Sequence, residues 1–298
     1  MKPTIQGQIV ASFGRHYLAE LAGGESITCV PRGKKSEVAC GDEVEIIRTA
    51  DASTGDGTGA QGVIERIMPR RSLLHRSDAF REKLIAANVT QIIVVVAAEP
   101  SFSDELLARC LVAAFDQKLD VLIVLNKCDL PEAAAAARKR LAPYTAIGYR
   151  VLELSAKQDV SALRPFLTNH TSVLVGQSGM GKSTLINTLL PGAHAATREI
   201  SAALDSGKHT TTHARLYRID ETSGLIDCPG VQAFGLHHLS FGGIEQGFVE
   251  FAQNLGKSRF RDCRHAQEPG CALHNAVAEG KIDERRLDLF LQISSNKA

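Results

Sequence analysis

The sequence predicts a multi-domain protein with a central α/β unit between a small N-terminal β-barrel and a C-terminal helical module. Short segments of alternating polarity fill the chain up to about Arg66. From Asn88 onward, buried apolar strands alternate with helical stretches, and after about Leu239 the strand patterns stop. The middle pattern is typical of a mainly parallel sheet covered by helices.

The barrel prediction rests on three short segments separated by glycine-rich turns, at Gln8–Ser12, Ser26–Val30 and Asp42–Ile47. Alternating apolar and polar residues between turn signals indicate antiparallel strands. A basic connector follows from Arg66 to Arg81, carrying Arg70, Arg71, Arg76 and Arg81. The α/β strands are expected at Ile92–Val96, Val121–Leu125, Val151–Leu154 and Val173–Val175, with a helix within Asp104–Lys118.

Composition excludes some protein classes and leaves the partner open. A chain of 298 residues with 44% apolar content can form two or three domains. The net charge is only +1, so any basic surface must be local. The N-terminus has no apolar signal segment and the stretch Ile92–Ala98 is too short to cross a bilayer, so we expect a cytoplasmic protein with no membrane partner. Seven scattered cysteines favour reduced thiols over a disulfide framework.

A glycine-rich loop, Gly176–Ser183, lies between the apolar run Thr171–Val175 and the helical segment Thr184–Leu190. Its glycines allow backbone N–H groups to point at phosphate oxygens, and the helix adds its positive end. Lys182 is expected to neutralise the β and γ phosphates, and Ser183 to bind Mg²⁺. The alternative is a strand-to-helix turn without a ligand. The predicted phosphate-binding residues are Gly176, Gln177, Ser178, Gly179, Met180, Gly181, Lys182, Ser183 and Thr184.

Two motifs before this loop predict guanine recognition. Asn126-Lys127-Cys128-Asp129 directly follows a predicted strand, and the Asp129 carboxylate can accept two N–H bonds from guanine. Asp129 as an ordinary helix N-cap is the alternative. Ser155, Ala156 and Lys157 follow the next strand, where a backbone N–H could meet guanine O6.

A fourth motif, Asp227-Cys228-Pro229-Gly230, follows the apolar pair Leu225–Ile226. Asp227 is expected to hold Mg²⁺ together with Ser183, directly or through water, and Gly230 to complete the GTP site. Many GTPases place a water-orienting glutamine straight after this motif, but Val231 stands there in this chain. We therefore expect slow intrinsic hydrolysis.

The order of these motifs is a permutation of the usual GTPase order, and the chain resembles the RsgA (YjeQ/EngC) family of circularly permuted GTPases over nearly its whole length. The resemblance implies an OB-type RNA-binding barrel at residues 1–68, a connector at 69–87, the GTPase domain at 88–239 and a zinc-type module at 240–298. It implies a monomer that hydrolyses GTP to GDP and phosphate, stimulated by the small (30S) ribosomal subunit during its late maturation, with contacts to 16S rRNA.

The segment Gly207–Thr212 resembles the switch I of that family. The resemblance implies that His209 helps to position the attacking water and that Thr211 or Thr212 completes the magnesium shell. Together with Lys182 these are the predicted catalytic residues. The alternative for His209 is a solvated loop histidine.

The C-terminal cluster departs from the family pattern Cys-x4-Cys-x-His-x5-Cys. Cys263, His265 and Cys271 occupy the last three positions, but Ser258 stands at the first, and a serine hydroxyl is a poor zinc ligand. Three outcomes stay open: Zn²⁺ held by three ligands and water, recruitment of His274, or a metal-free cluster. The neighbouring cations suit phosphate backbones, with a solvated basic face as the alternative: Lys257, Arg259, Arg261 and Arg264.

Three function classes follow from these motifs: a ribosome-activated GTPase, a GTP-dependent RNA-binding switch with incidental hydrolysis, and a P-loop kinase or ATPase. Asp129 argues against the third class, because an ATP-dependent enzyme does not need a double acceptor for guanine. We therefore expect the first, with Mg²⁺ and Zn²⁺ as its cofactors.

Overall fold

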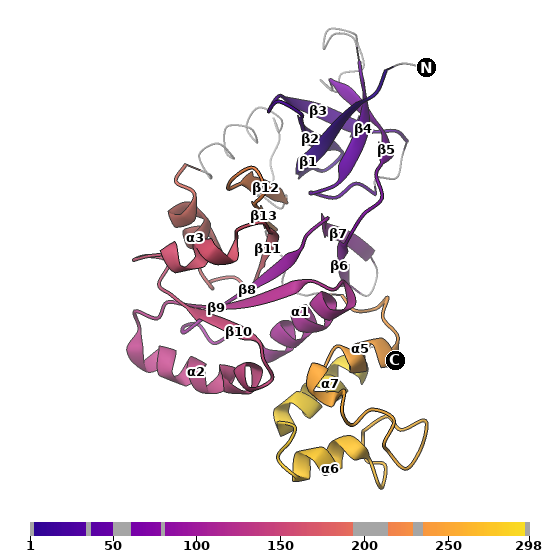
Figure 1. The fold of residues 1–298 in the computed structure, drawn as a ribbon, viewed down its shortest axis with the longest axis vertical. Coiled ribbons are helices and arrows are strands. Elements are labelled where there is room, and N and C mark those ends of the chain that lie inside the picture. Colours follow the sequence, from indigo (N-terminus) through magenta and orange to yellow (C-terminus); the bar gives the residue numbers. More distant parts are fainter. Residues whose placement is uncertain are drawn as a thin grey trace.

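The computed structural model describes residues 3–33, 37–49, 61–78, 81–192, 214–228 and 235–295, with backbone only at 76–78 and 81–83. The β-barrel lies at one end of the molecule, the α/β unit in the middle and the helical module at the other end (Figure 1). The predicted barrel and the parallel α/β unit are therefore confirmed. None of the described helices combines the length and apolarity needed to span a bilayer.

The barrel consists of five strands: β1 (Ile5–Phe13), β2 (His16–Leu21), β3 (Ser26–Pro31), β4 (Glu43–Arg48) and β5 (Gly62–Ile67). Pairing of β1 with β4 closes it. Side chains that alternate inward along these strands form its own core, including Ile9, Ile27 and Ile46. The three predicted segments lie largely within β1, β3 and β4, whereas β2 and β5 were not predicted.

The basic connector contains an antiparallel hairpin of β6 (Leu73–Asp78) and β7 (Arg81–Ala87). Arg70 donates two hydrogen bonds of 2.7 Å to the fully buried carboxylate of Asp42. A buried carboxylate needs such a partner, so Arg70 has a structural role. Arg71 lies 3.6 Å from the Glu43 carboxylate.

Five parallel strands form the α/β sheet: β8 (Gln91–Ala97), β9 (Asp120–Asn126), β10 (Arg150–Glu153), β11 (Thr171–Val175) and β13 (Gly224–Asp227). They lie in the order β10-β9-β8-β11-β13. Antiparallel β12 (Arg215–Arg218) follows, and its pairing with β1 makes the sheet continuous with the barrel. The helices of this unit are α1 (Asp104–Asp116), α2 (Pro131–Ala146), η1 (Ser161–Phe166) and α3 (Lys182–Leu189).

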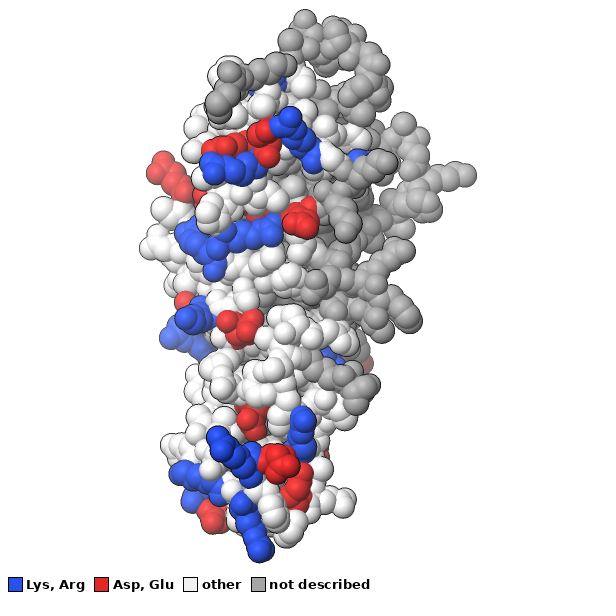
Figure 2. Space-filling model, turned by 90° about the vertical axis from the view of Figure 1, so that its right-hand side faces the viewer, with Lys and Arg blue, Asp and Glu red and all other residues white. Residues whose placement is uncertain are grey.

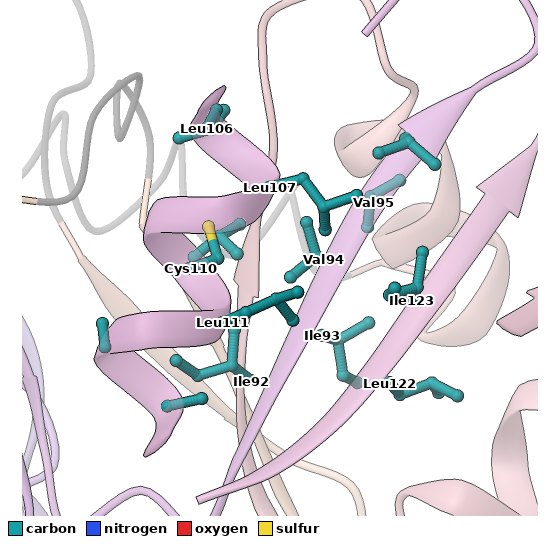
Figure 3. Packing of buried hydrophobic residues seen from close by; sticks show 14 of the residues in the cluster. Ile92, Ile93, Val94, Val95, Leu106, Leu107, Cys110, Leu111, Leu122 and Ile123 are labelled. Atoms are coloured by element: carbon teal, nitrogen blue, oxygen red, sulfur yellow. The ribbon is translucent and has the colours of Figure 1, made fainter. Parts of the chain in front are cut away.

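Charged side chains of both signs are interspersed over the face drawn in Figure 2, which agrees with the small net charge. Beneath the surface, α1 packs on β8 and β9 through Leu107, Leu111 and neighbouring aliphatic side chains (Figure 3). The β8 strand is buried along its whole length, as expected for a central parallel strand. Burial of each such side chain contributes about 1.5–3 kcal/mol of transfer free energy, which fixes the strand ends that carry the motifs.

The C-terminal module consists of α5 (Phe241–Gln246), η2 (Val249–Phe251), α6 (Ala272–Ala278) and α7 (Glu284–Ser295). Phe248, Phe251 and Phe290 pack together at its centre, and this core is continuous with that of the α/β unit. Both α5 and α7 contact α1. As expected, all seven cysteines are free thiols, and burial raises the pKa of Cys29 and Cys40 to about 12.

Candidate functional site

Several predicted motifs meet at the carboxyl ends of the parallel strands, where open α/β sheets bind ligands. A pocket of about 700 Å³ lies there. Twelve of the predicted nucleotide-binding residues line it: Asn126, Lys127, Asp129, Ser155, Ala156, Lys157, Ser178, Gly179, Gly181, Lys182, Ser183 and Thr184. Segments separated by up to about fifty residues of chain therefore surround one space.

Asn126 connects three of these segments. Its Nδ2 donates to the Met180 carbonyl at 2.9 Å, and its Oδ1 accepts from the N–H of Ala156 at 2.9 Å. Oδ1 also accepts from the N–H of Lys127 at 2.8 Å. The side chain is buried at the end of β9, so these bonds form away from solvent and fix the base-recognition loops relative to the phosphate loop.

The phosphate loop has backbone geometry that only glycine adopts easily. Gly176 and Gly181 have φ values of 151° and 89°. A Cβ at Gly176 would lie 2.2 Å from the Val95 carbonyl oxygen, and one at Gly181 would lie 2.3 Å from Asn126 Nδ2. The glycines thus permit both the turn and its close approach to β8 and β9.

Lys182 begins α3 directly after this loop, and its ammonium donates to the carbonyls of Gly176 at 2.5 Å and Gln177 at 2.9 Å. Burial lowers the pKa of Lys182, and the nearby charge of Asp227 opposes that shift. A partly buried ammonium at a helix start, beside backbone N–H groups, is suited to phosphate oxygens.

Asp129 does not cap the helix that follows it. The N-cap of α2 is Leu130, which forms no side-chain cap bond, so the alternative reading of Asp129 is not supported. The Ser155 hydroxyl beside it lowers the pKa of Asp129, and Lys157 and Lys127 lower it further. The exposed carboxylate at the mouth of the pocket is therefore ionised at neutral pH and able to accept hydrogen bonds.

Of the two predicted magnesium ligands, Ser183 lies in the first turn of α3 and Asp227 lies at the end of strand β13. Ser183 lines the pocket, and Asp227 is buried at the end of β13, which pairs with β11. Asp227 does not itself line the pocket, but its negative charge opposes the lowering of the Lys182 pKa that burial causes. A hydroxyl and a carboxylate are oxygen donors of the kind that Mg²⁺ binds.

Three pocket residues were not predicted from the sequence: Glu99, Pro100 and Leu130. The Glu99 carbonyl accepts a hydrogen bond of 2.6 Å from Lys127 Nζ. Glu99 follows β8, so the rule that ligands bind at the carboxyl ends of strands would have included it. Gln177 was predicted to bind nucleotide, but its Oε1 accepts from the N–H of Ser103 at 2.7 Å and so links the phosphate loop to α1.

The remaining predicted residues have different positions. Gly176 and Met180 support the phosphate loop without lining the pocket, and Met180 is buried. His209, Thr211, Thr212 and Gly230 lie outside the described residues. Val231, on which the expectation of slow hydrolysis rests, also lies outside them.

A second candidate site is the C-terminal Cys/His cluster. The ligand atoms of Cys263, His265 and Cys271 all lie within 4.8 Å of one another. His265 Nδ1 lies 3.2 Å from Cys271 Sγ, and its Nε2 lies 2.6 Å from Glu245 Oε1. A carboxylate at the far ring nitrogen orients an imidazole for metal binding, so three donors of the zinc type converge here.

Of the other two candidate ligands, Ser258 lies beside the cluster, where its hydroxyl opposes the rise in the Cys263 pKa that burial causes, whereas His274 does not join it. The Ser258 hydroxyl accepts a hydrogen bond of 3.0 Å from the N–H of Ala272, the first residue of α6. The His274 Nε2 lies within hydrogen-bond distance of the carbonyl oxygens of His265 and Ala266, at 3.1 and 2.9 Å. The structure therefore does not support recruitment of His274 as a fourth ligand.

Comparison with known proteins identifies the family. The family model described as RsgA GTPase matches residues 67–237. A relative from Nitrosospira multiformis, named small ribosomal subunit biogenesis GTPase RsgA, is 56% identical over 97% of this chain and 90% of its own length. A relative of the same name from Burkholderia pseudomallei is 52% identical over 97% of this chain and 91% of its own length.

Solved structures agree with this result. YjeQ from Thermotoga maritima superposes with a TM-score of 0.73 at 28% identity, covering 99% of both chains. YloQ, described as a circularly permuted GTPase, gives a TM-score of 0.68 at 24% identity over 99% of this chain and 95% of its own, which supports the fold. Because the family model spans more than half of the chain and the relatives align over nearly all of it, the chain belongs to the RsgA family of circularly permuted GTPases and is a GTP-hydrolysing enzyme.

Proposed function

We propose that this GTPase acts on the small ribosomal subunit, which stimulates its hydrolysis of GTP during late subunit maturation. The observation that supports the proposal most strongly is the single pocket in which the guanine-reading and phosphate-binding motifs meet. The names of its relatives support the choice of partner, since they are small ribosomal subunit biogenesis GTPases.

At the base end of the pocket, Asp129 accepts two N–H bonds from guanine while Asn126 holds the surrounding loops. At the other end, the loop N–H groups and Lys182 bind the phosphates and stabilise the charge that develops on them. Gly176, Gln177 and Met180 contribute to GTP binding as part of this loop. Residues Ser155 to Lys157 close the base side.

Ser183 and Asp227 would hold Mg²⁺, which neutralises phosphate charge when bound. Thr211 or Thr212 would complete its ligands, as the family resemblance implies, and Gly230 would complete the GTP site. His209 then positions the attacking water once the ribosome orders its segment. We also propose four parts of the chain: an OB-type barrel at 1–68, a connector at 69–87, the GTPase domain at 88–239 and a zinc-type module at 240–298.

The proposed partner surface is 16S rRNA, contacted by the barrel and by the C-terminal module. We propose a monomer in the cytoplasm, where ribosomal subunits assemble. Zinc would be held by Cys263, His265 and Cys271, with solvent as the fourth ligand, because the hydroxyl of Ser258 is a poor zinc ligand. Bound zinc would act structurally by joining the loop before α6 to the start of that helix.

The deciding experiment measures GTP turnover with and without purified small subunits, and the metal content of the same preparation by elemental analysis. Stimulation of about a hundredfold or more would be in the range expected when a partner orders a catalytic group. The variant His209→Ala should lose this stimulation while retaining GTP affinity. Unchanged turnover with subunits would favour the second candidate, a GTP-dependent RNA-binding switch with incidental hydrolysis.

A further inference from the structure

The loop that leads into the Cys/His cluster exposes an aromatic ring among cations. Residues 257–264, which we call the basic loop, contain Phe260 with 43% of its surface exposed. It is one of three large hydrophobic residues exposed in the described ranges, with Phe115 and Leu130. All four cations of the basic loop are also exposed: Lys257, Arg259, Arg261 and Arg264. The lower end of Figure 2, where the C-terminal module lies, shows Lys and Arg side chains at the surface.

The side chains of these cations form no ion pair with a carboxylate among the described residues, although the backbone N–H of Arg264 donates to Glu268, whereas three exposed arginines of the barrel are ion-paired. There, Arg32, Arg48 and Arg66 are each paired with a glutamate. The basic loop holds four cations and one acid, Asp262, so its net charge is 4 − 1 = +3. Its positive charge is therefore available to a partner.

The backbone of the basic loop is fixed on both sides. The Arg259 N–H donates to the Gly270 carbonyl at 3.0 Å, and the Cys263 N–H donates to the Phe260 carbonyl at 3.3 Å. The guanidinium of Arg264 stacks on Phe241, 4.6 Å from its ring centroid. Phe260 is thus presented from an ordered turn, which lowers the entropy cost of binding through it.

One guanidinium also lies beside the exposed ring. Arg259 is 5.5 Å from the Phe260 centroid, within range of a cation–π contact. An aromatic ring next to cations suits a nucleobase, because the base stacks on the ring while the cations hold the flanking phosphates. An acidic peptide would use the cations but not the face of the ring.

We propose that the basic loop binds single-stranded RNA and that an unpaired base stacks on Phe260, with phosphates held by Arg259 and Arg261. This inference rests on the proposed function, which makes RNA the partner, and it adds the kind of RNA recognised. In a duplex the bases already stack on one another, so paired RNA offers the ring no free face.

The absence of tryptophan from the sequence permits a direct test. Phe260→Trp introduces a single indole, whose fluorescence should be quenched when a short single-stranded oligoribonucleotide is added. A duplex of the same sequence should leave it unchanged. The matched control is Phe115→Trp on α1, at a phenylalanine that is 45% exposed, where neither RNA should alter the emission.

Affinity measurements complete the test. Phe260→Ala should weaken binding of the single strand about tenfold, and Phe260→Tyr should restore it, because one stacked base contributes about that much. Arg259→Ala with Arg261→Ala should reduce the salt dependence of binding. Equal affinity for the duplex, an unchanged indole signal, or quenching by polyglutamate in place of RNA would each overturn the proposal.

Subunit-stimulated GTP turnover, measured on the same preparations, separates this inference from the proposed function. A Phe260→Trp protein that small subunits stimulate but single-stranded RNA does not quench contradicts stacking and leaves the proposed function intact. An unmodified chain that subunits fail to stimulate contradicts the proposed function, whatever the indole reports.

Discussion

The Nδ2 atom of Asn126 donates a 2.9 Å hydrogen bond to the carbonyl of Met180, which joins the base-recognition segment to the phosphate loop. The same amide accepts from Ala156 N–H. Neither contact involves nucleotide. The two ends of the pocket are therefore held in register by the protein itself, and this gives a first prediction.

Asn126→Ala should reduce both stability and GTP affinity. It leaves the Met180 carbonyl and the Ala156 N–H without their partner, at a cost of about 1–3 kcal/mol for each buried group. Thermal unfolding and GTP titration measure the two effects. Asn88→Ala is the matched control, because Asn88 is also buried and bonds two backbone groups away from the pocket, the N–H of Arg71 and the carbonyl of Gly41. It should lower stability alone, and an equal loss of GTP affinity there would contradict the assigned role.

Asp129→Asn should exchange guanine preference for xanthine. The carboxylate offers two acceptors to guanine, whereas an amide offers one acceptor and one donor, which matches the carbonyl that xanthine carries instead of the amine. Turnover with GTP should fall about tenfold or more, and turnover with XTP should rise. Glu132→Gln removes an exposed negative charge in the first turn of α2 and should leave the GTP to XTP ratio unchanged. A similar ratio in both variants would argue that charge alone matters.

Sequence motifs predicted most of the residues that line the pocket, because each motif follows an apolar run typical of a strand and the carboxyl ends of parallel strands lie at one edge of the sheet. Glu99 was missed since it belongs to no motif, and only the parallel pairing of β8 with β11 brings its loop to the pocket. The hairpin β6–β7 was also missed, because its arginine-rich pattern lacks a clear apolar alternation.

Ser258 shows a different limit of sequence reasoning. From the pattern alone it is a missing zinc ligand, whereas the structure gives its hydroxyl a second role as acceptor for the first N–H of α6. This capping bond forms only because the chain folds back and brings Ala272, 14 residues later in the sequence, next to Ser258. Spacing within the motif carries no information about it.

The lowered pKa of Lys182 predicts that the protein takes up a proton when GTP binds. Burial lowers its pKa in the free protein, and a bound triphosphate favours the charged ammonium and raises the pKa again. Binding at a pH between these two values must therefore take up a proton. Calorimetry over a pH series that approaches the ordinary lysine pKa of about 10.4 from below should give a binding enthalpy that differs between buffers of unlike ionisation enthalpy. The difference should shrink as the pH falls, because the ammonium becomes charged in both states. A buffer effect that does not grow with pH would refute the assignment.

Ser258→Cys should complete a four-ligand zinc site. A thiolate is a far better zinc ligand than a hydroxyl, so the chelator concentration needed to remove half of the zinc should rise about tenfold or more. Ser258→Ala is the control, because it removes the capping bond, worth about 1 kcal/mol, without adding a ligand. Elemental analysis and a chelator titration distinguish the variants. Equal zinc retention in Ser258→Cys and Ser258→Ala would contradict a site built on Cys263, His265 and Cys271.

Replacing Gly247 tests how much the packing of the C-terminal module on α1 contributes to the stability of the protein. A Cβ there would lie 2.9 Å from Val112 Cγ1 and 3.0 Å from its Cα, so the helix backbone itself blocks a methyl group. The φ of Gly247 is −67°, which alanine adopts freely, and steric overlap is thus the only cost. Gly247→Ala should destabilise the protein by about 1–3 kcal/mol, the usual range for an overfilled core. Gly242→Ala, where a Cβ meets nothing within 4 Å, is the matched control and should not lower the unfolding temperature.

If both variants unfold alike, the contact between α1 and this module contributes little to stability. If only Gly247→Ala is destabilised and its zinc content stays normal, the module is held to the GTPase unit by packing against α1.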